Sequence, residues 1–242
     1  MARHNENVFC YMQKILISLI LFFVPYNFFL SKGTEPVIVV EESSTSCYEL
    51  YCEMNISRFI NYAAFEQAVS GYQKIEGRRK DILTLIDFTK PSTEERMYVL
   101  DMKNRKILYV SHVSHGRNSG GNYATSFSNI SGSYKSSLGF YLTENTYQGR
   151  NGYSLILNGL EKGINDKARE RAIVIHGAAY ANPSVIKSSG RLGRSLGCPA
   201  LPLNVSKPII DTIKGGSLLY IYANNHDYIA QSSILPSDST RM

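Results

Sequence analysis

The stretch from residue 173 to residue 199 constrains this chain most, because it carries two reactive side chains on sharply turned backbone. A β-branched run leads into His176-Gly177, and after a polar loop the stretch ends in GRSLGCP, residues 193–199. Such a run favours a buried strand. Histidine and cysteine are residue types that form a base–nucleophile pair in thiol catalysis. We therefore expect the fold to bring Cys198 close to His176.

The N-terminal segment, residues 1–33, has the pattern of a signal peptide or an uncleaved membrane anchor. Arg3 and Lys14 precede an apolar run from residue 15 to residue 24. This run is short for a membrane span and typical of the apolar part of a signal peptide. We therefore expect the body of the chain to be exported to the periplasm or cell envelope, with membrane contact only through this segment.

The four cysteines fall into different classes. Cys10 lies in the leader, and Cys47 and Cys52, five residues apart, are candidates for a disulfide in an oxidising compartment. Cys198 has no such neighbour and lies in a Gly-rich turn rather than in an apolar run. This position favours a reactive thiol over a buried, inert one.

The rest of the chain predicts a mainly β domain with a few covering helices. Residues 34–56, rich in Glu, Ser and Thr, indicate a linker, and residues 57–80 have apolar positions at helical spacing, which predicts an N-terminal amphipathic helix packed on the domain. We expect the domain over residues 81–223, with short helices starting at Asn165 and Ser206 and a flexible tail over residues 224–242. The expected strands are 82–88, 97–102, 106–114, 138–143, 154–157, 171–176 and 217–223.

Three local features favour thiol chemistry at Cys198. Pro199 restrains Cys198 to a cap-like conformation, where the partial positive charge of free amides stabilises a thiolate. Gly197 leaves room for a substrate carbonyl, and the amides around it can form an oxyanion cradle. His176 ends a strand and is followed by Gly177, so its ring can turn towards a cleft and needs a carbonyl to orient it.

These residues resemble the L,D-transpeptidase catalytic domain of peptidoglycan cross-linking enzymes, the YkuD fold. The shared motif is His176-Gly177, a loop, and then S-x-G-C over residues 195–198. The resemblance extends over residues 59–222 and is to a branch found in Gram-negative bacteria; it implies a β-sandwich or barrel-like sheet. Further segments that carry it are Ile86-Asp87-Phe88 with Pro91-Ser92, His115-Gly116-Arg117, Phe127-Ser128-Asn129, Ser136-Ser137-Leu138-Gly139, Gly159-Leu160 with Asn165-Asp166, and Gly193-Arg194-Ser195.

The resemblance implies a cysteine-dependent transpeptidase that uses no cofactor and no metal and is a carbapenem target. Cys198 would attack the meso-diaminopimelate carbonyl of a donor stem tetrapeptide and release D-alanine. Transfer to an amine gives a cross-link, whereas transfer to water makes the enzyme an L,D-carboxypeptidase. The implied supporting residues are His176 as base, Gly177 as its carbonyl partner, Ser195 as support for the turn, and the amides of Leu196, Gly197 and Cys198 as oxyanion donors.

Two positions depart from the family pattern. Leu196 stands where many members have histidine, and Ala200 stands where they carry Arg or Asn. We therefore expect Arg194 or Arg117 to bind the substrate carboxylate in their place. The full set of candidate substrate-binding residues is Arg194, Tyr180, Tyr141, His115 and Arg117.

Other classes of protein fit the sequence less well. The net charge of +6 is dispersed: it suits ordinary solubility or an anionic envelope polymer and is too weak to argue for nucleic acid. Peptidoglycan stem peptides are the partners that the resemblance implies. In a papain-like peptidase the cysteine precedes the histidine, the reverse of the order here. A zinc site could draw on His112, His115, His176 and His226, but their spacing matches no ligand motif. A non-catalytic cell-wall-binding module of the same fold remains an alternative.

Overall fold

The computed structural model describes residues 46–236, so the predicted leader over residues 1–33 lies outside the described part. The chain forms two compact units, residues 1–62 and residues 63–242. Among residues 46–236, no helix has the length and apolar character needed to cross a membrane.

The described part of the first unit contains helix α2 (Cys47–Glu53), so the linker predicted over residues 34–56 is wrong at these positions. Ser46 and Glu49 form a capping box: Ser46 Oγ accepts a hydrogen bond from the Glu49 amide at 3.2 Å, and Glu49 Oε2 accepts one from the Ser46 amide at 2.8 Å. Cys47 and Cys52 lie on this one helix, where a spacing of five residues turns their side chains to different faces. They are not bonded to each other.

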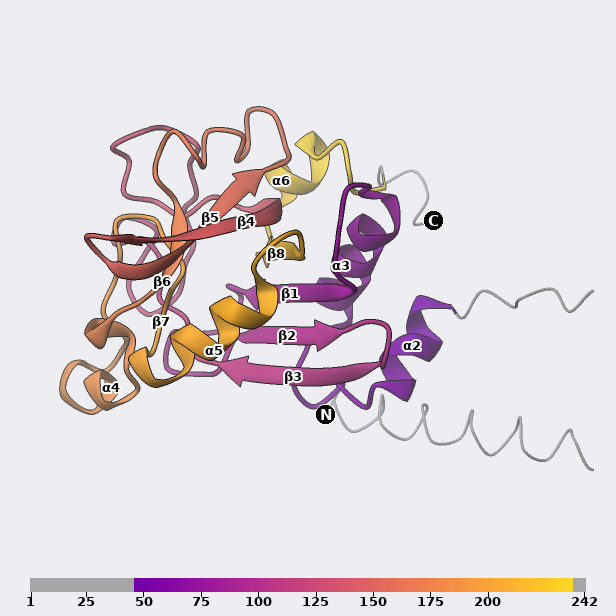
Figure 1. Cartoon of the computed structure of the whole chain (residues 1–242), viewed down its shortest axis with the longest axis horizontal. Coiled ribbons are helices and arrows are strands. Elements are labelled where there is room, and N and C mark those ends of the chain that lie inside the picture. The colour runs from indigo at the N-terminus through magenta and orange to yellow at the C-terminus, as the bar shows by residue number, and fades with distance from the viewer. Residues whose placement is uncertain (1–45, 237–242) are drawn as a thin grey trace, which may run out of the picture. The chain divides into compact units, whose positions relative to one another are not determined.

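The second unit is built on one eight-stranded sheet with the strand order β3-β2-β1-β8-β4-β5-β6-β7 (Figure 1). Neighbouring strands are antiparallel except for the pairs β1–β8 and β6–β7, which are parallel. The strands are β1 (Ile82–Asp87), β2 (Met97–Asp101), β3 (Lys106–Ser111), β4 (Gly139–Gly149), β5 (Gly152–Gly159), β6 (Val174–Gly177), β7 (Ala200–Leu201) and β8 (Leu218–Tyr222).

The sheet curls until its two edges approach each other. β3 and β7 are the edge strands, yet Ser114, three residues after β3, bridges to Ala200 in β7, with the Ser114 amide donating to the Ala200 carbonyl at 2.8 Å. The central strands β1 and β8 are almost wholly buried, which explains their continuous apolar sequences. The predicted class, a mainly β, barrel-like sheet with a few helices, is confirmed.

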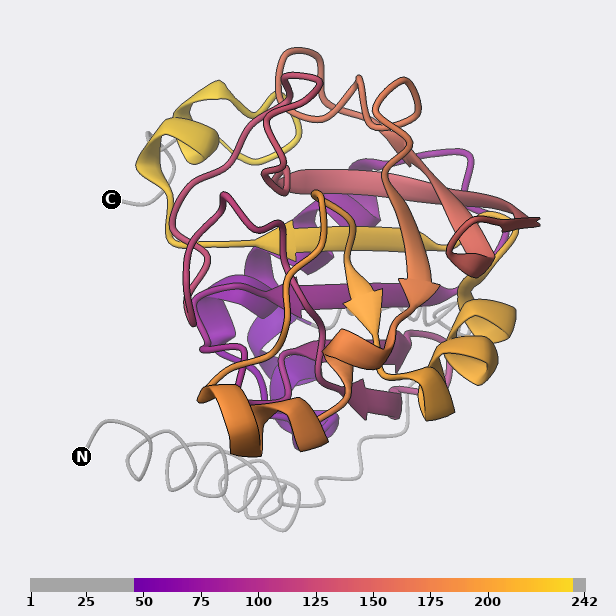
Figure 2. The ribbon, with the colours of Figure 1, turned by 90° about the vertical axis from the view of Figure 1, so that its left-hand side faces the viewer.

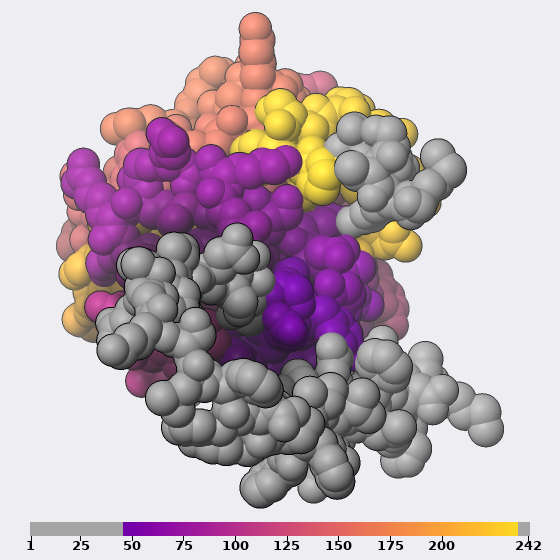
Figure 3. All heavy atoms as spheres, turned by 90° about the vertical axis from the view of Figure 1, so that its right-hand side faces the viewer, coloured from indigo at the N-terminus to yellow at the C-terminus, as the bar shows by residue number. Residues whose placement is uncertain are grey.

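The helix predicted within residues 57–80 is confirmed as α3 (Tyr62–Lys74), although it begins five residues after Ser57. Gly71 lets α3 approach β4 closely, because a Cβ at this position would lie 2.2 Å from the Phe140 ring. On the face shown in Figure 3, the residues around α3 lie against the C-terminal segment, where Lys74 Nζ donates to the Ile234 carbonyl at 2.6 Å.

Three of the other helix predictions need correction. No helix starts at Asn165, because its side chain binds the backbone of neighbouring segments instead: Nδ2 donates to the Leu138 carbonyl at 2.9 Å and Oδ1 accepts from the Glu161 amide at 2.9 Å. The helix predicted to start at Ser206 is α5 (Leu203–Ile213), which starts three residues earlier. The predicted flexible tail contains α6 (His226–Gln231), which Asn225 caps and which the buried Tyr228 anchors.

The long polar segment between β6 and β7 is also partly helical. It contains the short 3₁₀ turn η1 (Ala179–Ala181) and helix α4 (Ser184–Ser189). Gly190 ends α4 with a φ of 70°, a left-handed conformation that favours glycine. This segment returns the chain to the parallel partner of β6, and so carries it from His176 to Cys198.

Candidate active site

The parallel pair β6–β7 brings the predicted base and nucleophile to neighbouring positions (Figure 2). His176 is paired with Ala200, so Cys198, two residues before Ala200, lies beside Val174. The Val174 amide donates to Cys198 Sγ at 3.5 Å, which fixes the sulfur against β6. The strand register thus places Cys198 two residues from the one that pairs with His176.

The His176 ring is held in one orientation by its own neighbour. Nδ1 lies 3.0 Å from the Gly177 carbonyl, which can only accept, so Nδ1 carries the proton and Nε2 is left as the basic nitrogen. His176 is buried, and burial lowers its pKa, although the bond to Gly177 opposes the shift. Tyr180 packs edge-on against the ring, with 6.5 Å between centroids. At neutral pH His176 is therefore a neutral imidazole.

The Cys198 thiol is almost covered by protein, with 8% of the residue exposed. Burial raises its pKa, while the Val174 amide and the charge of Arg171 act in the opposite direction. The thiol donates to the Ala172 carbonyl at 3.6 Å, and Ala172 has a left-handed φ of 52° that presents this carbonyl. The expected stabilisation of a thiolate by a cap-like position is outweighed by desolvation, and the resting sulfur is a thiol.

Ser195 holds the turn that carries the cysteine. Its buried hydroxyl donates to the Cys198 carbonyl at 2.6 Å and accepts from the Gly197 amide at 3.0 Å. The predicted support of the turn by Ser195 is therefore visible as two hydrogen bonds. The same contact engages the Gly197 amide, which corrects the predicted oxyanion set and leaves the Leu196 and Cys198 amides as its candidate donors.

A second set of contacts fixes the turn from the other side. Ser136 Oγ donates to the Gly197 carbonyl at 3.0 Å and accepts from the Gly116 amide at the same distance. Gly197 has a φ of 128°, and a Cβ there would lie 2.9 Å from Ile173 Cδ1 and 3.0 Å from the Lys135 carbonyl oxygen. Only glycine fits this position without strain.

Arg171 is a site residue that the sequence reasoning missed. Its guanidinium donates to the carbonyls of Ser128 at 2.7 Å and Lys135 at 2.6 Å, and to Ser137 Oγ at 2.5 Å. Its charge also lowers the pKa of Cys198. Its place three residues before the buried strand β6 is the one sequence signal that could have indicated it.

The two predicted substrate-binding arginines are engaged in the loops beside the turn. Arg194 Nη1 donates to the carbonyls of Arg117 and Gly120, each at 2.9 Å, and the exposed Arg117 guanidinium stacks 4.2 Å from the centre of the Tyr134 ring. Ala200 is fully buried in β7, so a long side chain would not fit there. The cation electrostatically coupled to the thiol is Arg171 rather than Arg194 or Arg117.

Two other predicted substrate-binding residues are fully buried, which corrects their assignment. His115 Nδ1 lies 2.8 Å from Arg96 Nη2, and burial together with this positive charge lowers its pKa to about 4. Tyr141 donates its hydroxyl to the Ser137 carbonyl at 3.1 Å, and burial raises its pKa. Tyr141 thus supports the loop that carries Ser136, whereas the His115 carbonyl accepts a hydrogen bond from the Ser195 amide at 2.9 Å. Tyr180, which is half-buried, and Leu196, which is 59% exposed, remain available at the site.

A zinc site needs several ligand side chains close together. Within residues 46–236, no three His, Cys, Asp or Glu side chains come together as a metal site would require. The zinc alternative included His112, whose Nε2 lies 3.2 Å from the Thr93 carbonyl.

Comparisons with known proteins were made with this geometry in hand. No curated protein sequence matches the chain. Similar solved structures include an L,D-transpeptidase from Mycobacterium smegmatis (13% identity, TM-score 0.37, 59% of each chain). Others are the helical cell shape determining protein Pgp2 from Campylobacter jejuni (16%, 0.41, 61% of this chain and 49% of that one) and an L,D-transpeptidase from Stackebrandtia nassauensis (14%, 0.36, 76% and 69%). The chain thus spans about three fifths of the length of the first of these, and TM-scores this low carry no argument.

The family comparison is decisive. The model of the L,D-transpeptidase catalytic domain, YkuD_2, matches residues 57–222 and so spans most of the chain, including the whole sheet and the turn that carries Cys198. The chain belongs to the L,D-transpeptidase catalytic domain family.

Proposed function

We propose that this chain is a cysteine-dependent L,D-transpeptidase acting on peptidoglycan stem peptides, with Cys198 as nucleophile and His176 as base. The observation that carries the proposal is the pairing of a nearly buried thiol, seated against β6 by the Val174 amide, with an imidazole whose Nδ1 is fixed on the Gly177 carbonyl. Membership of the L,D-transpeptidase catalytic domain family supports peptidoglycan stem peptides as the substrate class. The donor in this proposal is a stem tetrapeptide with meso-diaminopimelate before its terminal D-alanine.

Acylation begins from a neutral pair. Burial raises the pKa of Cys198 and lowers that of His176, so the thiol proton moves to His176 Nε2 only as the sulfur attacks the donor carbonyl. The tetrahedral intermediate then collapses, the C–N bond to D-alanine breaks, and the imidazolium returns the proton to the leaving amine. The product is a thioester on Cys198.

The oxyanion of the intermediate is bound by the amides of Leu196 and Cys198. Ser195 keeps these amides in place by bracing the turn on both sides of Gly197. Donors fixed before the reaction stabilise developing charge without reorganisation, and each contributes about 3–4 kcal/mol in other acyl-transfer enzymes.

Deacylation uses the same groups in reverse. His176 Nε2 takes a proton from an acceptor amine as the amine attacks the thioester, and returns it to the sulfur as the thiol leaves. Transfer to an amine in preference to water is supported by the burial of Cys198, because few waters reach a site that is 8% exposed. The carboxypeptidase reaction is the same sequence with water as the acceptor.

The proposal places the enzyme in the periplasm or cell envelope, where its substrate lies. Its basis is the leader pattern of residues 1–33. Cell fractionation with an antibody to the body of the chain tests it, and a signal confined to the cytoplasm would contradict export.

The decisive experiment incubates the purified full chain with a disaccharide tetrapeptide and, separately, with a carbapenem. Mass spectrometry should show loss of D-alanine, a cross-linked dimer and a carbapenem adduct on Cys198. Cys198→Ser and His176→Ala should abolish turnover, whereas His112→Ala is the matched control for a histidine outside the site. Wild type that gives neither product nor adduct would refute the enzyme. Activity that survives Cys198→Ser and is lost with a chelator would assign the chemistry to a metal.

A further inference from the structure

Two neighbouring hollows lie outside the thiol site and are assigned no role by the proposed reaction. One, of about 190 Å³, lies between the loop around Phe127 and helix α6, and the other, of about 270 Å³, continues from it beside β1. They share Phe127 and Asn225, and each alone is small against the roughly 300–1,000 Å³ of ordinary ligand pockets. We call the pair the Phe127 groove.

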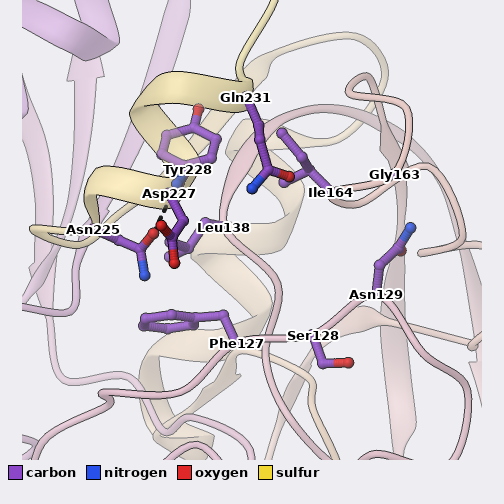
Figure 4. A pocket seen from close by; sticks show the side chains of 10 residues that line it. All are labelled: Phe127, Ser128, Asn129, Leu138, Gly163, Ile164, Asn225, Asp227, Tyr228 and Gln231. Carbon is purple, nitrogen blue, oxygen red and sulfur yellow. Dashed lines mark hydrogen bonds between the residues drawn. The ribbon is translucent and has the colours of Figure 1, made fainter.

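The groove presents hydrogen-bonding groups that no described part of the chain uses. Figure 4 shows the Asp227 carboxylate and the Gln231 amide turned towards the hollow from α6. Within the described residues, neither side chain has a hydrogen-bond or ion-pair partner. Asn225 Oδ1 accepts a hydrogen bond from the Tyr228 amide at 2.7 Å, which leaves Asn225 Nδ2 as a donor. A ligand that enters the groove can therefore replace its hydrogen bonds to water by hydrogen bonds to the Asp227 carboxylate and to the side-chain amides of Asn225 and Gln231.

Aromatic rings form the apolar part of the groove. The Phe127 ring faces the polar side chains in Figure 4 and stacks on Phe88, with centroids 6.2 Å apart and an angle of 12° between the planes. Phe88 is 1% exposed, so it anchors Phe127 as a rigid platform. In the second hollow Tyr123 is 51% exposed. A flat ring bordered by amide and carboxylate groups suits a pyranose, which has an apolar C–H face and a rim of hydroxyl and amide groups.

The charge of the groove selects against other ligands. None of the described residues that line the two hollows is Lys or Arg, and Asp227 is the one acid among them. A phosphate or a free carboxylate would meet Asp227 with no compensating cation, which is unfavourable. A neutral, polyhydroxylated ligand meets no such repulsion, and a carboxylate is a strong acceptor for its hydroxyl groups.

The groove is connected to the thiol site through Arg171. Nη1 of Arg171 donates to the carbonyl of Ser128, which lines the groove, and Nη2 donates to the carbonyl of Lys135, which packs against Gly197. One guanidinium thus spans from the groove to the turn that carries Cys198.

We propose that the Phe127 groove binds the glycan strand of peptidoglycan, a chain of N-acetylated amino sugars, while the stem peptide attached to that strand enters the Cys198 site. The proposal rests on the proposed function for the identity of the polymer. Its new content is that the enzyme holds the sugar backbone as well as the peptide, with Phe127 as platform and Asp227 and Gln231 as hydrogen-bonding residues.

Binding is tested with the N-acetylglucosamine tetramer by saturation-transfer NMR and calorimetry on the full chain. Wild type should bind saturably, and Asp227→Ala with Gln231→Ala should weaken binding about tenfold or more, as expected for losing a bond to a charged group. The matched control is Glu76→Ala with Gln73→Ala, an exposed acid and amide outside the groove. Tyr123→Ala is a second groove variant with little risk to folding. Absence of saturable binding, equal losses in the control, or binding of a free stem tetrapeptide in the groove in place of the sugar would overturn the proposal.

A kinetic arm separates this proposal from the proposed function. The groove variants should raise KM for intact glycan-linked substrate about tenfold and leave kcat/KM for a sugar-free tetrapeptide unchanged. Normal tetrapeptide turnover without sugar binding would refute glycan binding in the groove but leave the proposed transpeptidase activity standing. Sugar binding without any reaction at Cys198 would refute the proposed transpeptidase activity but leave glycan binding in the groove standing.

Discussion

The Ser195 hydroxyl offers the sharpest test of how the cysteine turn is built. Ser195→Ala removes one oxygen and leaves two groups in a buried region without their partner, the Cys198 carbonyl and the Gly197 amide. An unsatisfied buried group costs about 1–3 kcal/mol, and each kcal/mol lowers Tm by about 2–4 °C in a chain of this size. Because the lost bonds fix the residues that carry the nucleophile and oxyanion donors, we expect turnover to fall about 100-fold, the effect of a shift of roughly 1 Å.

Ser217→Ala is the matched control, because it removes an equally buried hydroxyl far from the thiol. Ser217 Oγ donates to the Ile213 carbonyl at 2.6 Å and lies 3.2 Å from Thr143 Oγ1. Thermal unfolding should show a similar loss of stability in both variants. Turnover of the disaccharide tetrapeptide and alkylation of Cys198 should change only in Ser195→Ala. Full turnover in a destabilised Ser195→Ala would refute the argument, since the hydroxyl would then serve the fold alone.

Three further predictions follow from the charges around the site. Burial raises the pKa of Cys198 and lowers that of His176, so the rate at which iodoacetamide alkylates Cys198 should still rise above pH 9. A rate that reaches a plateau between pH 6 and pH 8 would instead reveal a thiolate–imidazolium pair. Arg171→Met should raise the pKa of Cys198 further and slow its alkylation at pH 8, whereas Arg171→Lys should keep the rate. Equal effects of the two substitutions would exclude a role for the charge. The pKa of His115 falls from 6.5 to about 4 on folding, so the unfolded chain binds the extra proton between these pH values. The free energy of unfolding should therefore drop by on the order of 2–3 kcal/mol as the pH falls from 6.5 towards 4. Urea titrations of wild type and His115→Gln at several pH values measure this loss, and identical pH profiles would contradict it.

The elements that the sequence predicted well are those whose pattern is local. The strand that ends near His176 and the strands on either side of residues 103–105 each follow from side-chain period over a few residues. Cys198 and His176 could also be proposed as nucleophile and base from the sequence, because their glycine neighbours and strand position are visible in the chain itself.

The features that were missed depend on contacts between distant segments. Asn165 is a good helix cap by type, but its amide is used to join Leu138 and Glu161, so no helix forms. Arg171 becomes part of the site only because the loop from residue 128 to residue 137 folds over it. Helix α6 looked too polar to be ordered, and its order depends on a single buried residue, Tyr228.

The burial of Cys198 fits a site without a polar side chain at position 196 or position 200, where the family resemblance implies histidine and Arg or Asn. In an exposed site, a nucleophile needs nearby charges to favour the thiolate. Here the thiol and imidazole are both kept neutral by desolvation, so that charge appears only when substrate arrives. Ala200 can then be a packing residue in β7, and the exposed Leu196 is free to contact substrate. On this reasoning, Leu196→His should alter KM for the donor more than kcat, because position 196 contributes its amide to the reaction and its side chain only to binding. A fall in kcat with an unchanged KM would show that the side chain acts on the chemical step.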